Sequence, residues 1–286
     1  MKPENEILKD FYLLADYLEK KYKIKNVNKY KNNISAFLLH ANHIKSYDFI
    51  APFCMGKKVL DIGCFIGYGE TRIFSQAKEI IAIDSDDDAL DFARNRFIPN
   101  VRFEKADAKR LPFPKETFDI IIAFQLIEHI PFNEVGNFLS EVKKILKEKG
   151  LLFISTPNRK FRLMPFQRPF NREHYQEFTA KELLKLLEPH FEKVQIKGVR
   201  AKKWIEEIEK QRVRKSPLIK LKKHFKKIGS NMIKRFQSNS KKTSMANNEF
   251  NRLFNNFSMD DFYLDDHNLN KSMVLFAICE KYNHTE

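Results

Sequence analysis

The stretch KKVLDIGCFIGYGE, residues 57–70, decides the fold of this chain. Its apolar first half suits a central parallel strand, and that strand ends on an acid, Asp61. Gly63 and Gly67 then permit tight backbone geometry, and residues 68–77 are predicted to continue as a helix whose N-terminus faces a ligand. This order of strand, glycine turn and helix predicts a nucleotide-type pocket at the end of the strand.

The residues of the turn argue against a bound dinucleotide. A dinucleotide fingerprint requires GxGxxG with a small middle residue, whereas GCFIGYG places Phe65 at that position. Asp61 would repel a pyrophosphate, but its carboxylate suits the ammonium group of an amino-acid-like cofactor. The turn therefore favours a cofactor that combines a nucleoside with an amino acid.

The run VLDIGCFIGYG resembles motif I of the class I S-adenosylmethionine-dependent methyltransferases, whose usual pattern is an acid followed by GxGxG. The middle glycine of that pattern falls on Phe65, which is expected to narrow the methionine end of the pocket. The resemblance covers about residues 45–200 and 272–281. It implies an α/β fold with a seven-stranded, mostly parallel sheet and helices on both faces, and S-adenosyl-L-methionine as the cofactor.

Polar residues at later strand ends extend the predicted cofactor site. Asp84 ends the second apolar strand and lies 23 residues after Asp61, a spacing that suits both hydroxyls of a ribose. The resemblance assigns Asp107 and Ala108 to the adenine. The alternative for the three acids is a role as helix caps or turn residues. The predicted cofactor-binding residues are Asp61, Gly63, Gly67, Asp84, Asp107, Ala108 and Gln125.

Two histidines are the predicted catalytic residues, because an imidazole titrates in the range useful for removing a proton from an acceptor hydroxyl. His129 follows Glu128 at the end of the fourth apolar strand, beside the expected methyl group. His174 lies in NREHYQEF, which resembles an HxxEF element of family members that methylate sugars, quinone precursors and lipid-linked glycans. Two alternatives remain open: Glu128 and His129 cap a helix or hold the cofactor, and His174 orients its loop.

The segment that leaves the fifth predicted strand, residues 155–187, is expected to bind the acceptor. It crosses the carboxyl edge of the sheet, where α/β proteins hold ligands. Arg162, Arg168 and Arg172 are predicted to bind a phosphate or carboxylate of the acceptor through paired hydrogen bonds. Thr179 and Glu182 fit a capping box, which predicts that a helix begins there.

Residues 1–50 are predicted to form a helical cap over the pocket or an association surface. Their apolar residues recur at helical spacing, at Ile7, Phe11, Leu14 and Leu18. Positions similar to His40, His43 and Tyr47 lie over the cofactor entrance in related methyltransferases, and the alternative is that these histidines are packed or face solvent.

A basic insertion precedes the last predicted strand. Residues 201–243 hold 15 Lys or Arg and three Glu, which accounts for +12 of the net charge of +15. Residues 217–236 predict an amphipathic helix, and three roles stay open for it: binding to an anionic membrane surface, packing on its own domain, and contact with nucleic acid. The serine- and asparagine-rich residues 238–251 predict a mobile linker.

The predicted domains are the cap at 1–50, a methyltransferase core at 51–200 with 272–286, and the insertion with its linker at 201–271. No apolar run approaches the roughly 18 to 20 residues that span a bilayer, and residues 1–12 lack the features of a secretory signal. We therefore expect a cytoplasmic protein, and the membrane-binding role of 217–236, one of the three open roles, would attach it to the inner membrane surface. No disulfide and no metal site is predicted, because no CxxC pattern joins Cys54, Cys64 and Cys279.

Together these patterns predict an S-adenosylmethionine-dependent methyltransferase that O-methylates a small molecule, a sugar or a lipid-linked intermediate. An RNA methyltransferase that uses the basic insertion is one alternative, although the chain lacks an NPPY-type motif and a recognisable RNA-binding module. A non-catalytic cofactor-binding protein or membrane adaptor is the other, and Phe65 is the residue that suggests it.

Overall fold

The computed structural model describes residues 3–23, 27–163, 167–169, 171, 173–213 and 242–281. The predicted amphipathic helix at 217–236 lies outside these residues, as does Arg172. The chain divides into two compact units, one of residues 1–41 with 201–261 and the other of residues 42–200 with 262–286.

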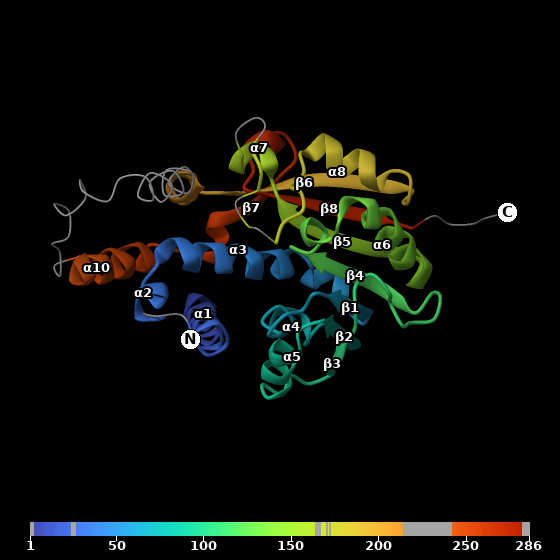
Figure 1. Cartoon of the computed structure of the whole chain (residues 1–286), viewed down its shortest axis with the longest axis horizontal. Helices are drawn as coiled ribbons and strands as arrows, with labels where there is room; N and C mark the ends of the chain where they lie inside the picture. Colours follow the sequence, from blue (N-terminus) through green and yellow to red (C-terminus); the bar gives the residue numbers. More distant parts are fainter. Residues whose placement is uncertain are drawn as a thin grey trace, which may run out of the picture. The chain divides into compact units, whose positions relative to one another are not determined.

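The unit of residues 42–200 and 262–286 is built on an eight-stranded sheet in the order β3-β2-β1-β4-β5-β8-β6-β7 (Figure 1). The first five strands in this order pair in parallel, and β8 runs antiparallel between β5 and β6. The strands are β1 (Lys58–Ile62), β2 (Glu79–Asp84), β3 (Val101–Lys105), β4 (Phe118–Phe124), β5 (Leu146–Pro157), β6 (Lys193–Ala201), β7 (Phe262–Asp265) and β8 (Val274–Glu280).

The predicted α/β fold with a mostly parallel sheet is confirmed, but the sheet has eight strands and not seven. The additional strand, β7, falls in the region predicted to be insertion and linker, and it adds an edge beside β6. A single FYLD run is too short for an alternating pattern to be recognised, and its partners lie more than 60 residues earlier. Arg200 of β6 reaches Asp265 of β7 at 3.2 Å, a contact that only pairing of the two strands creates.

Helices cover both faces of this sheet, as predicted. Figure 1 shows α6 and α8 on one face, and α4 and α5 on the other. Apolar residues of β1, β2, β4, β5 and β8 form one buried cluster with α6 and α8, which is why the central strands are apolar almost throughout. The helices of the chain are α1 (Pro3–Tyr22), α2 (Val27–Lys31), α3 (Ile34–Ile50), α4 (Glu70–Ile73), α5 (Asp87–Arg94), α6 (Phe132–Ile145), α7 (Arg159–Arg162), α8 (Ala180–Leu187) and α10 (Lys242–Asn255), with 3₁₀ turns η1 (Ala51–Cys54), η2 (Ile127–His129), η3 (Met259–Asp261) and η4 (Leu269–Lys271).

Two helix starts test the local predictions. The helix after the glycine turn covers only Glu70–Ile73, shorter than the predicted 68–77, because Gly69 is a poor helix former and turns surround α4. The capping box at the start of α8 is confirmed, since the Thr179 hydroxyl accepts from the backbone N–H of Glu182 and the Glu182 carboxylate accepts from that of Thr179. Among the described residues no helix is both long and apolar enough to cross a bilayer.

In the other unit, part of the predicted mobile linker is helical. Residues 242–251 of that linker, together with residues 252–255, form helix α10. The rings of Phe250, Phe254 and Phe257 lie 6.0, 5.3 and 5.2 Å from the ring of Phe37, each in an edge-on arrangement. Phe250 and Phe254 are four residues apart, so they lie on one face of α10, and Phe257 follows just after its end. The contacts of the three rings with Phe37 stabilise α10 against α3.

Candidate functional site

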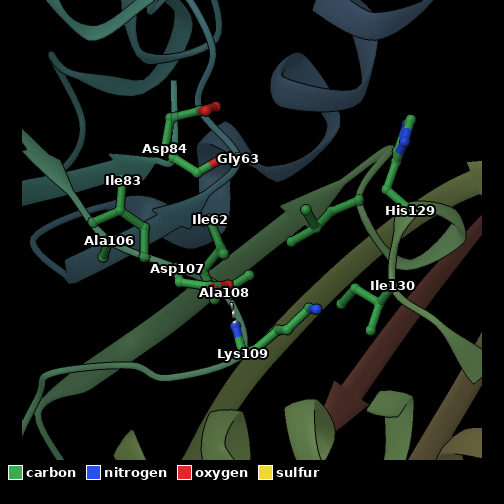
Figure 2. Close-up of a pocket in the computed structure, with 12 residues that line it drawn as sticks. Ile62, Gly63, Ile83, Asp84, Ala106, Asp107, Ala108, Lys109, His129 and Ile130 are labelled. Atoms are coloured by element: carbon green, nitrogen blue, oxygen red, sulfur yellow. Dashed lines mark hydrogen bonds between the residues drawn. The ribbon is translucent and has the colours of Figure 1, made fainter. Parts of the chain in front are cut away.

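A pocket of about 230 Å³ lies at the carboxyl ends of β1 to β4. Figure 2 shows Gly63 and Asp84 on one side of it and His129 with Ile130 on another, while the segment after β3 lies below. Ligands of open α/β sheets bind at this edge, where the loops of adjacent strands diverge. Five of the predicted site residues line the pocket, namely Gly63, Asp84, Asp107, Ala108 and His129.

Asp84 is held rigidly at the end of β2. Its Oδ2 atom accepts a hydrogen bond of 2.8 Å from the backbone N–H of Phe65, and its Oδ1 atom accepts one of 2.9 Å from that of Asp86. A carboxylate has about four lone-pair sites, so both oxygens keep acceptor capacity for a ligand. The side chain can therefore accept two hydroxyl groups without losing the contacts that orient it.

The segment after β3 contributes one pocket residue, Lys109, that no sequence pattern indicates. Asp107 accepts a hydrogen bond of 2.9 Å from the backbone N–H of Lys109, the dashed line in Figure 2, which fixes the turn. Lys109 lines the pocket too, and its ammonium lies 2.8 Å from the carboxylate of Glu134 in α6. A lysine two residues after the predicted adenine contact carries no pattern of its own, so only the structure finds it.

The two predicted glycines have different surroundings. Both have a positive φ, 85° at Gly63 and 73° at Gly67, which favours glycine. Gly63 lines the pocket, whereas a Cβ on Gly67 would lie 2.8 Å from the ring of Phe103. Gly67 is therefore explained by packing against β3, and it does not line the pocket.

Phe65 occupies the left-handed region with a φ of 51°, where a side chain costs about 1–2 kcal/mol. We expect the Phe65→Gly variant to have a free energy of unfolding about 1 kcal/mol above that of Phe65→Ala, because both variants lose the ring but only glycine relieves the backbone. Denaturant unfolding of the two variants measures the difference. Equal stabilities would mean that the turn carries no strain.

Asp61 is buried below the turn and shares hydrogen bonds with two buried side chains. The Tyr47 hydroxyl donates to its Oδ2 at 2.9 Å, and the carboxyl group of Glu70 is its second hydrogen-bond partner. Tyr47 belongs to α3, where His43 lies 3.4 Å from the Tyr68 hydroxyl. The structure thus places two of the predicted entrance residues next to motif I, although Asp61 does not line the pocket itself.

A second carboxyl group, Glu70, is buried near Asp61. Burial raises the pKa of Glu70 well above its usual range, and the neighbouring Asp61 raises it further. Burial also raises the pKa of Asp61 to about 7. Both groups therefore hold protons in the folded chain at pH values where they are ionised in the unfolded chain.

This arrangement predicts that the free energy of unfolding falls as pH rises. The stabilisation is complete below pH 4, the range of the unfolded carboxyls, and is lost as pH rises through 7 and above, where the folded groups ionise. We expect Glu70→Gln to raise the free energy of unfolding at pH 8 by about 1 kcal/mol or more and to change it less at pH 5, because the amide is neutral at every pH and needs no proton on folding. Denaturant unfolding at both pH values, with the exposed Glu188→Gln as the control, measures this, and a pH-independent effect of Glu70→Gln would contradict it.

At the edge of the pocket, three side chains from two segments come together, namely those of Glu128, His129 and His174. The centroids of the two imidazoles lie 4.7 Å apart with their planes 84° to each other. Glu128 is fully buried, and its Oε2 accepts a hydrogen bond of 2.9 Å from the hydroxyl of Thr156 in β5. Burial raises the pKa of Glu128 to about 7, and burial together with His174 lowers the pKa of His129.

The segment that carries His174 is attached to the end of β4 by its backbone. Tyr175 donates its N–H to the carbonyl of Glu128 at 2.9 Å, and the Gln176 amide donates to the carbonyl of Ile130 at 2.8 Å. Nδ1 of His174 lies 3.1 Å from the buried carboxylate of Glu177. These contacts fix the position of His174 relative to His129, although 45 residues separate them in the sequence.

The remaining predicted residues are not gathered at the pocket. Gln125 has a φ of 52° and its amide donates to the Ser155 hydroxyl at 3.1 Å, so it links β4 to β5. Arg162 lies 3.7 Å from the carboxylate of Glu177, and Arg168 is exposed. Arg172 lies outside the described residues. An acceptor site formed by the three arginines therefore stays a prediction.

The chain resembles methyltransferases in sequence. A family model for a methyltransferase domain matches residues 34–190. A probable S-adenosylmethionine-dependent methyltransferase of Mycobacterium tuberculosis is 37% identical over 145 residues, 51% of this chain and 52% of that protein. A ubiquinone biosynthesis O-methyltransferase of Bartonella bacilliformis is 32% identical over 113 residues, 38% of this chain and 44% of that protein. The chain thus spans about half the length of the curated relatives it matches.

Solved structures show the same fold. A possible histamine N-methyltransferase of Thermotoga maritima superposes with a TM-score of 0.53 at 15% identity, covering 93% of this chain and 99% of that one. The [4+2]-cyclase SpnF superposes with a TM-score of 0.52 at 15% identity, covering 85% of this chain and 82% of that one. At such identities the likeness concerns the fold alone, and it agrees with the predicted sheet and helices.

Proposed function

This chain belongs to the methyltransferase domain family, and we propose that it transfers the methyl group of S-adenosyl-L-methionine to an oxygen atom of a small molecule, a sugar or a lipid-linked intermediate. One observation carries the proposal: Gly63, Asp84 and Asp107 line one pocket at the ends of three adjacent strands. The names of the relatives support the cofactor, since the sequence match includes S-adenosylmethionine-dependent enzymes. The match to a ubiquinone biosynthesis O-methyltransferase supports an oxygen acceptor.

The polar groups around the pocket fit the cofactor. We assign the two ribose hydroxyls to Asp84 and the adenine to the turn at Asp107 and Ala108, because these residues line the pocket. We assign the ammonium group of the methionine part to Asp61, a buried acid in β1 whose carboxylate suits a cation. When bound, the cofactor supplies a methyl group on a positively charged sulfur, which an oxygen nucleophile can attack.

The protein contributes position and proton removal. An acceptor oxygen must approach in line behind the methyl group, with water excluded, and little covalent catalysis is needed. His129 lines the pocket and His174 contacts it, so this pair lies where an acceptor hydroxyl would lose its proton. The arginines of the loop after β5, Arg162, Arg168 and Arg172, are proposed to hold an acidic group of the acceptor.

The first test is binding followed by transfer. We expect calorimetry to show one S-adenosylhomocysteine bound per chain, and labelled cofactor to deliver its methyl group to a cell extract. The extract is then fractionated into lipid, RNA and small-molecule pools. Label in the lipid or small-molecule pool supports the proposal, and label in RNA supports the RNA alternative. Binding without any transferred label would favour the non-catalytic protein.

A membrane surface is the proposed partner of residues 217–236, which lie outside the described residues. The proposal rests on their sequence, in which lysines alternate with an apolar stripe, and each cation adds about 1 kcal/mol near an anionic leaflet. We expect the full chain to float with vesicles that contain phosphatidylglycerol, and a chain lacking 217–236 to float less. Equal flotation of the two chains would count against the membrane.

A further inference from the structure

We propose that Glu128, His129 and His174 bind a divalent transition metal ion at the edge of the pocket. Each residue offers one ligand atom, and the three atoms lie within 4.8 Å of one another. Two imidazole nitrogens and one carboxylate oxygen are a ligand set typical of Zn²⁺ and of neighbouring metals such as Co²⁺. No metal site was expected from the sequence, which lacks a CxxC pattern, and these donors come from two distant segments without a recognisable spacing.

The carboxylate of Glu128 supplies an independent reason to expect a cation at this site. Its side chain is fully buried, and Oε1 has no hydrogen-bond partner among the described residues. Oε2 is held by the Thr156 hydroxyl at 2.9 Å, so the group is oriented while one oxygen remains unused. A buried oxygen without a partner is costly, and a cation between Glu128 and the two imidazoles would satisfy it.

The surroundings of His174 match those of a metal ligand. A ligating histidine usually gives its second ring nitrogen to a carboxylate, which fixes the tautomer and the orientation of the ring. Nδ1 of His174 lies 3.1 Å from Oε1 of Glu177, which leaves Nε2 for a metal. Arg162 lies 3.7 Å from the same oxygen of Glu177. Glu177, which orients the proposed ligand His174, is thus itself held in place by Arg162.

A metal ion held by these residues would lie at the edge of the pocket, because His129 also lines it. Three protein ligands would leave a fourth position for an acceptor hydroxyl. The ion would act as a Lewis acid that lowers the pKa of this hydroxyl, and solvent water would take the proton. The oxygen would then bond to the methyl carbon as the carbon–sulfur bond breaks and its electron pair passes to sulfur. His129 would be a ligand in this scheme and not the base.

The test measures metal binding directly, with Co²⁺ as the probe and the full chain treated first with a chelator. We expect one Co²⁺ per chain with visible absorption bands of a nitrogen- and oxygen-ligated site, and displacement of Co²⁺ by Zn²⁺ in calorimetry. Glu128→Gln and His174→Gln keep the size of each side chain, and each should weaken Co²⁺ binding at least tenfold. Glu177→Gln should weaken it by about tenfold, as expected for a residue behind a ligand.

His267→Gln is the matched control, because His267 is exposed and lies on a loop after β7. It should leave Co²⁺ binding unchanged. Circular dichroism must show that each variant is folded. Absence of Co²⁺ binding to the folded chain, or unchanged binding in His174→Gln, would overturn the site.

The catalytic role of the metal rests on the proposed methyl transfer, whereas its binding does not. Methyl transfer that continues in excess chelator would overturn the role of the metal and leave the proposed function intact. Failure to bind S-adenosylhomocysteine together with normal Co²⁺ binding would overturn the proposed function and leave the metal site intact. Loss of methyl transfer in chelator, with recovery on addition of Zn²⁺ or Co²⁺, would support the role in the reaction.

Discussion

Replacing His129 with alanine should lower the rate of methyl transfer by about a hundredfold to ten-thousandfold, the range usual for a group that acts on the proton of the acceptor. Affinity for S-adenosylhomocysteine should change little, since Asp84, Asp107 and Gly63 remain in the pocket. The physical reason is that His129 lines the pocket at the edge where we propose that the acceptor binds. Turnover of labelled cofactor and calorimetric binding, measured on the same protein, give the two quantities.

His174→Gln separates the two roles open to His129. If His129 acts alone as a base, His174→Gln affects turnover less than His129→Ala, because only the neighbour of the base has changed. If both histidines hold a metal, the two variants lose turnover to a similar degree. The exposed His267→Gln is the control. Unchanged turnover in His129→Ala would remove this residue from either role.

Asp84→Ala should weaken the binding of S-adenosylhomocysteine by about a hundredfold or more. Hydrogen bonds to a charged group contribute about 1.5–3 kcal/mol each, and Asp84 is placed to accept two from a ribose. Asp84→Asn keeps one acceptor oxygen and should fall between the alanine variant and the natural chain. Calorimetry gives all three affinities.

Two controls accompany the Asp84 variants. Asp91→Ala removes a carboxylate that is exposed on α5 and paired with Arg94, so affinity should be unaffected. Asp84 also accepts backbone N–H groups of Phe65 and Asp86, so thermal unfolding must show that each variant is folded. A folded Asp84→Ala chain with normal affinity would show that the ribose binds elsewhere.

The sequence predicted much of the fold because the signals are local. An apolar run that ends in Asp61 or Asp84 predicts both a buried strand and the place where it ends. Parallel strands bring such ends to one edge of the sheet. The capping box at Thr179 and Glu182 involves residues three apart, and the structure confirms it. Edge strand β7 and helix α10 were not predicted, because their stability depends on partners far away in the sequence.

The site residues also show that contacts between distant segments cannot be predicted from the sequence. Gly67 of the predicted turn packs against Phe103, and Gln125 after the fourth strand donates to Ser155, so neither residue lines the pocket as predicted. Lys109 lines the pocket without a motif to mark it. The contact of His129 with His174 depends on backbone hydrogen bonds such as that from Tyr175 to Glu128, which no spacing in the sequence reveals.

By itself, the sequence determined that this chain forms a glycine turn and a series of buried strands with acids at their ends, because strand periodicity and turn geometry depend on neighbouring residues. Only the tertiary structure decided which side chains face the pocket, that Asp61 and Glu70 are buried with raised pKa values, and that Glu128 joins two histidines. Burial and contact between distant segments are properties of the packed chain, since they exist only when the strands and loops have come together.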